Sequence, residues 1–143
     1  MSYSYQRRVK YHETDQMGVV HHANYLHMFE EARTEYLRQK GISYRELEEA
    51  GVILPVVELN CNYRQPAVYD DLLTIEVEVE NLKRVRVSFS YQVKRDDNLL
   101  VTASSVHPFV DEDFKPLALK REKPELWEII FGKEYSQCPN YQK

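Results

Sequence analysis

The sequence is poor in cysteine and in long apolar runs. It holds two cysteines, Cys61 and Cys138, whose spacing matches neither a metal site nor a redox motif. Because Cys61 lies in a strand-like run, we expect it to be a small buried apolar residue. No apolar run is long enough to span a bilayer, and the N-terminal segment MSYSYQRRVK has no apolar stretch of the signal-peptide type. These absences predict a protein of the reducing cytoplasm without membrane insertion.

The sequence also lacks a basic excess, since 19 Lys and Arg face 23 Asp and Glu. This balance argues against a general nucleic-acid binder, although it leaves room for a local basic patch. The 143 residues contain no internal repeat and no linker. We therefore predict one domain over residues 1–131, followed by a polar C-terminal tail at residues 132–143.

A long helix is predicted at residues 24–39, NYLHMFEEARTEYLRQ. Its apolar residues recur at the spacing that lines one face of a 3.6-residue period: Tyr25, Met28, Phe29, Ala32, Tyr36 and Leu37. Gly41 supplies the stop signal. Ser43 and Glu46 have the spacing of a capping box, which predicts a short second helix to about Ala50.

Strands are predicted by a change of period. Apolar and polar residues alternate in LTIEVEVENLK, RVRVSFSYQVKR and LVTASSVHPFV, between residues 73 and 110. Period two over consecutive segments indicates an antiparallel sheet with one apolar face, and Asp96 to Asn98 form a predicted hairpin turn. Further strands are predicted at residues 3–12 and 53–62. Pro124 begins a predicted terminal helix with the apolar residues Leu126, Trp127, Ile130 and Phe131.

This element order predicts an α+β fold of two layers, with the long helix against the concave side of a twisted antiparallel sheet. A helix of 16 residues is about 24 Å long, which is comparable to the width of such a sheet. His107 falls on the apolar face of its strand, so we expect a buried histidine with hydrogen-bond partners.

The segment before the long helix carries most of the ionisable chemistry. The stretch YHETDQMGVVHHANY, from Tyr11 to Tyr25, resembles the signature of hotdog-fold acyl-CoA thioesterases of the 4-hydroxybenzoyl-CoA thioesterase type, a group that includes the Tol–Pal-associated bacterial thioesterases. FEEAR at residues 29–33 and YRQPAVYDDLLTIEVEV at residues 63–79 extend the resemblance, which covers roughly residues 3–120. It implies a hotdog fold, in which a curved sheet wraps a central helix, and hydrolysis of acyl-CoA to a free acid and coenzyme A.

Hydrolysis of a thioester requires an attacking oxygen and donors for the oxyanion that develops. A carboxylate beside a helix start supplies the attack, either directly or through water. The helix supplies donors, because its leading N–H groups are unpaired and its dipole places about half a positive charge there. Gly18 allows the backbone to approach a substrate closely, and Asn24 is a good N-cap residue, with a helix start one or two residues earlier as the alternative.

The resemblance implies roles for individual residues. Asp15 is the expected nucleophile or general base, His22 polarises the carbonyl through its backbone N–H with possible acid–base help from its ring, and Tyr11 is a positioning group. Each also has a structural interpretation, namely a turn aspartate, a solvated histidine at the helix start and a packed tyrosine of the sheet. Four further residues are assigned to substrate binding: Gly18, Val19, Asn24 and Tyr25.

The histidines do not predict a metal site, because metalloprotease spacing is absent and His22 and His27 are five residues apart. We expect His21 to point away from His22, since neighbours on a helix do not share a face. Glu31 is either an ordinary helix-surface glutamate or a residue near the site, because some relatives use a helix glutamate. No cofactor is expected, since coenzyme A is part of the substrate.

Coenzyme A carries phosphates, so a cationic patch is expected. Residues 81–95 hold five basic residues and no acid, and we assign three of them to coenzyme A: Lys83, Arg84 and Arg86. An ordinary charged strand face remains the alternative. In the family the nucleotide lies near such residues, often those of the neighbouring subunit, so the resemblance implies a homodimer or a homotetramer.

Other functions stay open at this point. The same fold could act on acyl carrier protein, which also presents phosphate and acid to a basic patch. A hotdog lyase or a non-catalytic acyl-CoA binder is the third alternative, although the local motifs of hotdog dehydratases are absent and a binder would not need Asp15.

Overall fold

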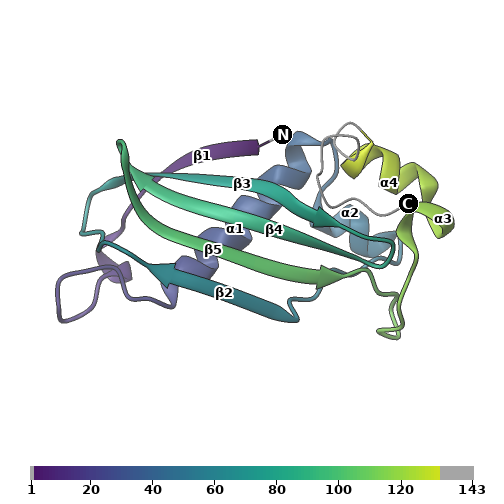
Figure 1. The fold of residues 1–143 in the computed structure, drawn as a ribbon, viewed down its shortest axis with the longest axis horizontal. Coiled ribbons are helices and arrows are strands. Elements are labelled where there is room, and N and C mark those ends of the chain that lie inside the picture. Colours follow the sequence, from purple (N-terminus) through teal and green to yellow (C-terminus); the bar gives the residue numbers. More distant parts are fainter. Residues whose placement is uncertain (1, 133–143) are drawn as a thin grey trace.

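The computed structural model describes residues 2–132, which form one antiparallel sheet with a long helix across it (Figure 1). The five strands lie in the order β1-β3-β4-β5-β2. Their bounds are β1 Ser2–Arg8, β2 Glu58–Tyr63, β3 Leu72–Leu82, β4 Arg86–Arg95 and β5 Asn98–Pro108. The helices are α1 Asn24–Gln39, α2 Tyr44–Glu49, α3 Leu119–Glu122 and α4 Pro124–Phe131, with a short 3₁₀ helix at Tyr11–Glu13. The predicted α+β hotdog arrangement is confirmed.

Helix α1 has the bounds that the sequence predicts, and one of its faces is buried. All six predicted apolar residues are at most 2% exposed, and Arg33 joins them on this face. At the C-terminus, Ile42 N–H donates to Leu37 O at 3.1 Å and Gly41 N–H to Arg38 O at 3.0 Å. This is a Schellman motif, and its left-handed residue is Gly41 with φ of +95°.

The predicted capping box of α2 is also confirmed. Ser43 Oγ accepts the backbone N–H of Glu46 at 3.1 Å, and Glu46 Oε1 accepts the backbone N–H of Ser43 at 3.3 Å. Helix α4 begins at Pro124 as predicted and buries Trp127, Ile130 and Phe131, while Leu126 is partly buried. The local signals for starts and ends therefore fix the helices well.

Strands β3, β4 and β5 form the predicted meander, whose apolar residues face α1. Phe29 of α1 stacks on Tyr91 of β4 with ring centroids 4.6 Å apart, and Tyr36 meets Phe89 at 5.4 Å. The β4–β5 turn contains Asp96, which has a left-handed φ of +55°. Aspartate tolerates this conformation better than most residues, which is consistent with the predicted turn.

Two strand predictions are wrong at their ends. The first strand stops at Arg8 rather than at residue 12, because Tyr11–Glu13 turn into the 3₁₀ helix. The second begins at Glu58 rather than at residue 53, since Pro55 has no N–H for a strand ladder. Cys61 on β2 is only half-buried, because this strand forms an edge of the sheet. Beyond Gly132, the predicted polar tail lies outside the described residues.

A polar cluster lies buried between α1 and the sheet. We call Arg33, Tyr91, Ser105 and His107 the His107 cluster; each is at most 7% exposed. Arg33 Nη1 donates to Tyr91 Oη at 3.0 Å, Tyr91 Oη lies 2.6 Å from Ser105 Oγ, and Ser105 Oγ lies 2.7 Å from His107 Nε2. The prediction of a buried, hydrogen-bonded His107 is confirmed. Burial, together with the charge of Arg33, lowers the pKa of His107 from 6.5 to about 4.

Candidate active site

The turn that carries Asp15 is closed by its own backbone hydrogen bonds. Thr14 and Val20 form an antiparallel bridge, and the N–H of Asp15 donates to Val19 O at 2.9 Å. Gly18 N–H returns to Asp15 O at 2.9 Å, and its φ of +81° explains why glycine is suited to this position. The side chain of Asp15 is fixed as well, because its Oδ1 accepts the N–H of Met17 at 2.9 Å.

The turn leads to the start of α1, where most backbone donors are already occupied. The N–H groups of Asn24, Tyr25 and Leu26 donate to the carbonyls three residues before them, at 2.9, 3.3 and 3.2 Å. The N–H of Ala23 donates to His21 Nδ1 at 3.2 Å. Within residues 2–132, the N–H of His22 has no acceptor. The free donor is therefore two residues before the helix, and not in its first turn as expected from an ideal helix end.

Asn24 does not cap the helix. The N-cap position is held by Ala23, which makes no side-chain capping bond, and Asn24 is the first residue of α1. Its Nδ2 instead donates to the backbone carbonyl of Glu13 at 2.8 Å. The expectation of an N-cap is wrong because a tertiary acceptor binds this side chain.

A groove of about 300 Å³ lies beside the turn and the helix start. Asp15, Val19, His22 and Tyr25 line it, so the structure brings four of the predicted site residues together. The other lining residues are Met17, Val20, Tyr63, Arg64, Gln65 and Pro66. Gly18 lies between two lining residues, whereas Asn24 faces Glu13. Asp15 and His22 therefore border one partly apolar groove.

Tyr11 is not part of this groove. Its side chain is 77% exposed, and its ring meets Tyr69 edge to face with centroids 5.5 Å apart. The role of Tyr11 as a positioning group stays a prediction.

Tyr63 and Arg64, at the end of β2, are groove residues to which the sequence analysis gave no role. Tyr63 Oη donates to the backbone carbonyl of His22 at 3.2 Å, and its ring lies 5.6 Å from that of Tyr25. Burial raises the pKa of both tyrosines to about 12, so at neutral pH they are hydroxyl donors. The only available signal was their place in the YRQP segment of the family resemblance, which carries no chemical pattern by itself.

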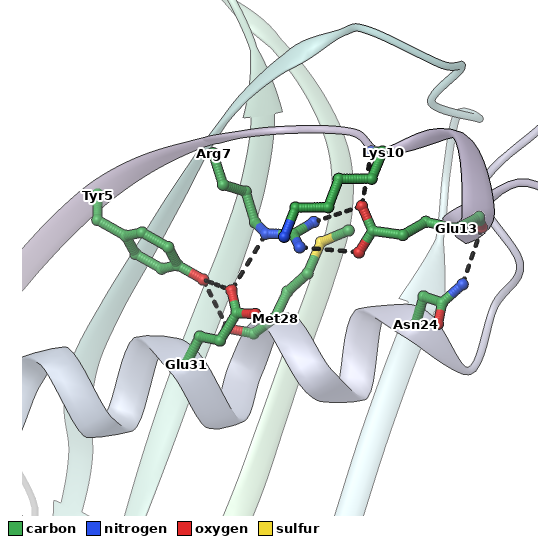
Figure 2. A network of polar contacts seen from close by, with 7 residues as sticks. All are labelled: Tyr5, Arg7, Lys10, Glu13, Asn24, Met28 and Glu31. Atoms are coloured by element: carbon green, nitrogen blue, oxygen red, sulfur yellow. Dashed lines mark hydrogen bonds and ion pairs between the residues drawn. The ribbon is translucent and has the colours of Figure 1, made fainter.

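A second polar cluster joins β1 to α1 beside the turn (Figure 2). We call Tyr5, Arg7, Glu13, Asn24 and Glu31 the Glu13 cluster. Arg7 binds the Glu13 carboxylate through both Nη atoms, at 3.1 and 2.8 Å, and its Nε lies 3.1 Å from Glu31 Oε2. Tyr5 Oη donates to Glu31 Oε2 at 2.9 Å and lies 3.0 Å from Met28 O. Glu31 is therefore bound to β1 and does not line the groove.

The two neighbouring histidines do not diverge as expected. The rings of His21 and His22 lie together, with centroids 4.3 Å apart and planes at 31°. The helix rule fails here because both residues precede the first residue of α1. Within residues 2–132, no three His, Cys, Asp or Glu side chains gather as metal ligands. In the same part of the chain, no helix is both long and apolar enough to cross a membrane.

The β3–β4 hairpin, which carries the basic residues, lies at the far end of the sheet from the segment between β1 and α1 (Figure 1). Arg8, the last residue of β1, pairs with Leu72 at the start of β3, whereas Lys83, Arg84 and Arg86 follow the last residue of β3. Ten residues of strand separate the two ends by about 33 Å. The other two cations of the segment bind acids, Lys94 with Glu76 at 3.2 Å and Arg95 with Asp71 at 2.8 Å.

Comparison with known proteins identifies the family of this chain. The family model of the Thioesterase superfamily matches residues 17–102. An acyl-CoA thioesterase of Haemophilus influenzae, YbgC, is 39% identical over 122 residues, which cover 84% of this chain and 90% of that protein. The crystal structure of a DHNA-CoA thioesterase from Staphylococcus aureus is 34% identical, with a TM-score of 0.87 over 94% of this chain and 91% of that chain.

A 4-hydroxybenzoyl-CoA thioesterase structure aligns with a TM-score of 0.78 over 87% of this chain and 97% of that chain, and at 24% identity it supports the fold alone. The chain belongs to the Thioesterase superfamily, as its signature segment predicts. It is a thioester hydrolase with the hotdog fold.

Proposed function

We propose that the protein hydrolyses acyl-CoA thioesters to a carboxylic acid and coenzyme A, with Asp15 as the nucleophile or general base. The observation that carries this proposal is the groove lined by both Asp15 and His22, together with the absence of an acceptor for the His22 N–H within residues 2–132. The similarity to an acyl-CoA thioesterase and a DHNA-CoA thioesterase supports coenzyme A as the thiol half of the substrate.

The chemistry follows from these two groups. In one route a carboxylate oxygen of Asp15 attacks the acyl carbon, the thiolate leaves, and water hydrolyses the resulting anhydride. In the other route Asp15 removes a proton from the water that attacks the acyl carbon. In both routes the carbonyl oxygen gains negative charge, and the N–H of His22 is the proposed donor that stabilises it. Met17 N–H holds one carboxylate oxygen and leaves the other for the reaction.

The active unit is proposed to be a homodimer or a homotetramer. Strand β2 is an edge strand, and Leu59 and Tyr63 on it are 36% and 48% exposed. An exposed apolar edge favours pairing with another chain. Because the basic hairpin residues lie at the far end of the same sheet from Asp15, we propose that the hairpin of a neighbouring subunit supplies Lys83, Arg84 and Arg86 to the phosphates.

Replacing Asp15 by Asn tests the catalytic assignment. We expect kcat/KM with short, long and aromatic acyl-CoA substrates to fall by about 100-fold or more, because the amide neither attacks nor accepts a proton. Asp97→Asn in the exposed β4–β5 turn is the matched control and should retain the native rate. A loss of only a few-fold at Asp15 would contradict the assignment.

The thiol half of the substrate needs a separate measurement. Acyl-CoA and acyl carrier protein that carry the same acyl group should be compared at equal concentration. We expect higher kcat/KM with acyl-CoA, and a preference for the carrier protein would replace the proposed substrate by the alternative one.

A further inference from the structure

Glu13 uses its side chain and its main chain for two different connections. The carboxylate accepts two bonds from Arg7 and a third from the N–H of Lys10, at 2.8 Å. The main-chain carbonyl accepts the N–H of His21 at 2.9 Å and Nδ2 of Asn24 at 2.8 Å. Glu13 is only 5% exposed. One residue therefore ties strand β1 to the segment that leads into α1 (Figure 2).

The two donors to the Glu13 carbonyl lie on either side of His22. His21 precedes it, and Asn24 follows it by two residues. Between His21 and Asn24, the His22 N–H is the backbone donor that has no acceptor within residues 2–132. The same carbonyl also lies two residues before Asp15. A displacement of the Glu13 carbonyl would thus change the position of His22 relative to Asp15.

We propose that Glu13 and Asn24 are positioning residues for the hydrolysis: through one shared carbonyl oxygen they align the His22 N–H with the Asp15 carboxylate. This inference rests on the proposed function. Neither residue lines the groove, so neither is expected to touch the substrate. Their effect is on geometry, and a misplacement of about 1 Å can cost an enzyme about 100-fold in rate.

The ion pair between Glu13 and Arg7 explains how the side chain of Glu13 fixes the position of its own main-chain carbonyl. Its hydrogen bonds hold the pKa of Glu13 below its ordinary value despite burial, so the carboxylate is charged at neutral pH. A bidentate pair with arginine fixes orientation as well as distance. Strand β1 is itself bound to β3 along seven residue pairs, from Ser2 to Arg8. The position of the Glu13 carbonyl is therefore fixed relative to the sheet, through Arg7 and strand β1.

Asn24→Ala tests the inference, because it removes one donor to the carbonyl and leaves the groove lining unchanged. We expect kcat to fall by about 10-fold to 100-fold, whereas the Kd of a non-hydrolysable thioether analogue of acyl-CoA stays within about threefold. Ser43→Ala is the matched control, since it removes a side-chain cap from α2 and should lower the Tm without changing kcat.

Glu13→Gln is the second variant, which decides the question if Asn24→Ala does not fold. It keeps an oxygen for the N–H of Lys10 and loses the charge that Arg7 binds. The same lower kcat at unchanged analogue Kd is expected. The inference is overturned if the variant that folds changes kcat no more than Ser43→Ala does, or if analogue binding weakens in parallel with kcat.

These outcomes separate this inference from the proposed function. If Asp15→Asn abolishes hydrolysis while Asn24→Ala and Glu13→Gln behave as the control, only the positioning role fails. If Asp15→Asn leaves hydrolysis nearly intact, the proposed function fails first.

Discussion

The Glu13 cluster and the His107 cluster both join helix α1 to the sheet, but they differ in charge and in depth. In the Glu13 cluster Arg7 lies between two carboxylates, and the side chain of Glu31 is 47% exposed. In the His107 cluster all four residues are buried, and Arg33 makes no ion pair within residues 2–132. Ion pairs thus bind the helix beside the groove, whereas in the core Arg33 binds it to neutral hydroxyl and imidazole groups of the sheet.

The difference implies different responses to substitution and to acid. A charged pair that is nearly buried fails when one partner is removed, because the other charge is left without compensation. A hydroxyl network loses hydrogen bonds of moderate strength. In the unfolded chain His107 gains its proton at a higher pH than Glu13, since the ordinary pKa values are 6.5 and 4.5, so acid affects the stability contribution of His107 first.

Arg7→Met is expected to have the largest effect on stability. The exposed fractions of the Arg7 and Glu13 side chains are 11% and 6%, so the variant leaves a buried carboxylate unpaired. We expect a loss of about 3–5 kcal/mol in the free energy of unfolding, measured by urea denaturation. Lys94→Met is the control, because its pair with Glu76 is about one-third exposed and should cost less than about 1 kcal/mol. Equal losses would remove the distinction between the pairs.

The pH dependence of stability is the second test of the difference between the two clusters. The pKa of His107 is about 4 in the folded protein and 6.5 as an ordinary value, so the unfolded chain binds the proton more readily. Stability is therefore complete above pH 6.5 and falls toward pH 4, by at most about 3 kcal/mol. Urea midpoints between pH 4 and 7 measure this slope.

His107→Gln supplies the reference for that experiment. The variant should lack the loss between pH 6.5 and 4, because it has no imidazole to protonate. The pKa of Glu13 is lowered too, but because its hydrogen bonds with Arg7 and Lys10 outweigh burial, and its stabilising effect is lost only as the pH falls below 4.5. If the stability of the native protein and of His107→Gln falls equally between pH 6.5 and 4.5, His107 is not the titrating group.

Tyr91→Phe is expected to have the smallest of these effects. It removes the hydroxyl that accepts from Arg33 and contacts Ser105, and should cost about 1–3 kcal/mol in thermal or urea unfolding. Because the His107 cluster is outside the groove, kcat should remain at the native value. A fall in kcat comparable to that of Asn24→Ala would show that the core cluster also controls the site.

Much of the fold can be predicted from the sequence because its signals are local. The apolar spacing and Gly41 predict both ends of α1, and the alternation from residue 73 to 110 predicts the meander. Predictions failed where a distant residue decides the local structure. The 3₁₀ helix at Tyr11–Glu13 coincides with the ion pair between Glu13 and Arg7, and Asn24 binds a carbonyl eleven residues away instead of capping its helix.

The part of the candidate site that could be predicted is the part that is local in sequence. Asp15, Val19, His22 and Tyr25 come from one continuous segment, and the structure places all four along one groove. Tyr63 and Arg64 reach this groove only because β2 lies at the edge of the sheet, next to the helix start. Glu13 was present in the signature segment, but its partners on β1 and α1 could not be known before the fold.

The strand order has a consequence for how the molecule forms. Strands β3, β4 and β5 are joined by short turns, whereas Ser2 on β1 pairs with Glu78, so this pairing closes a loop of about 75 residues. Such contacts between distant parts of the chain form slowly. We expect the meander to fold before its two edges attach, so that Arg7 and Tyr63 arrive late. The protein would then acquire its core before it acquires its groove, and enzymatic activity would return after most of the secondary structure during refolding.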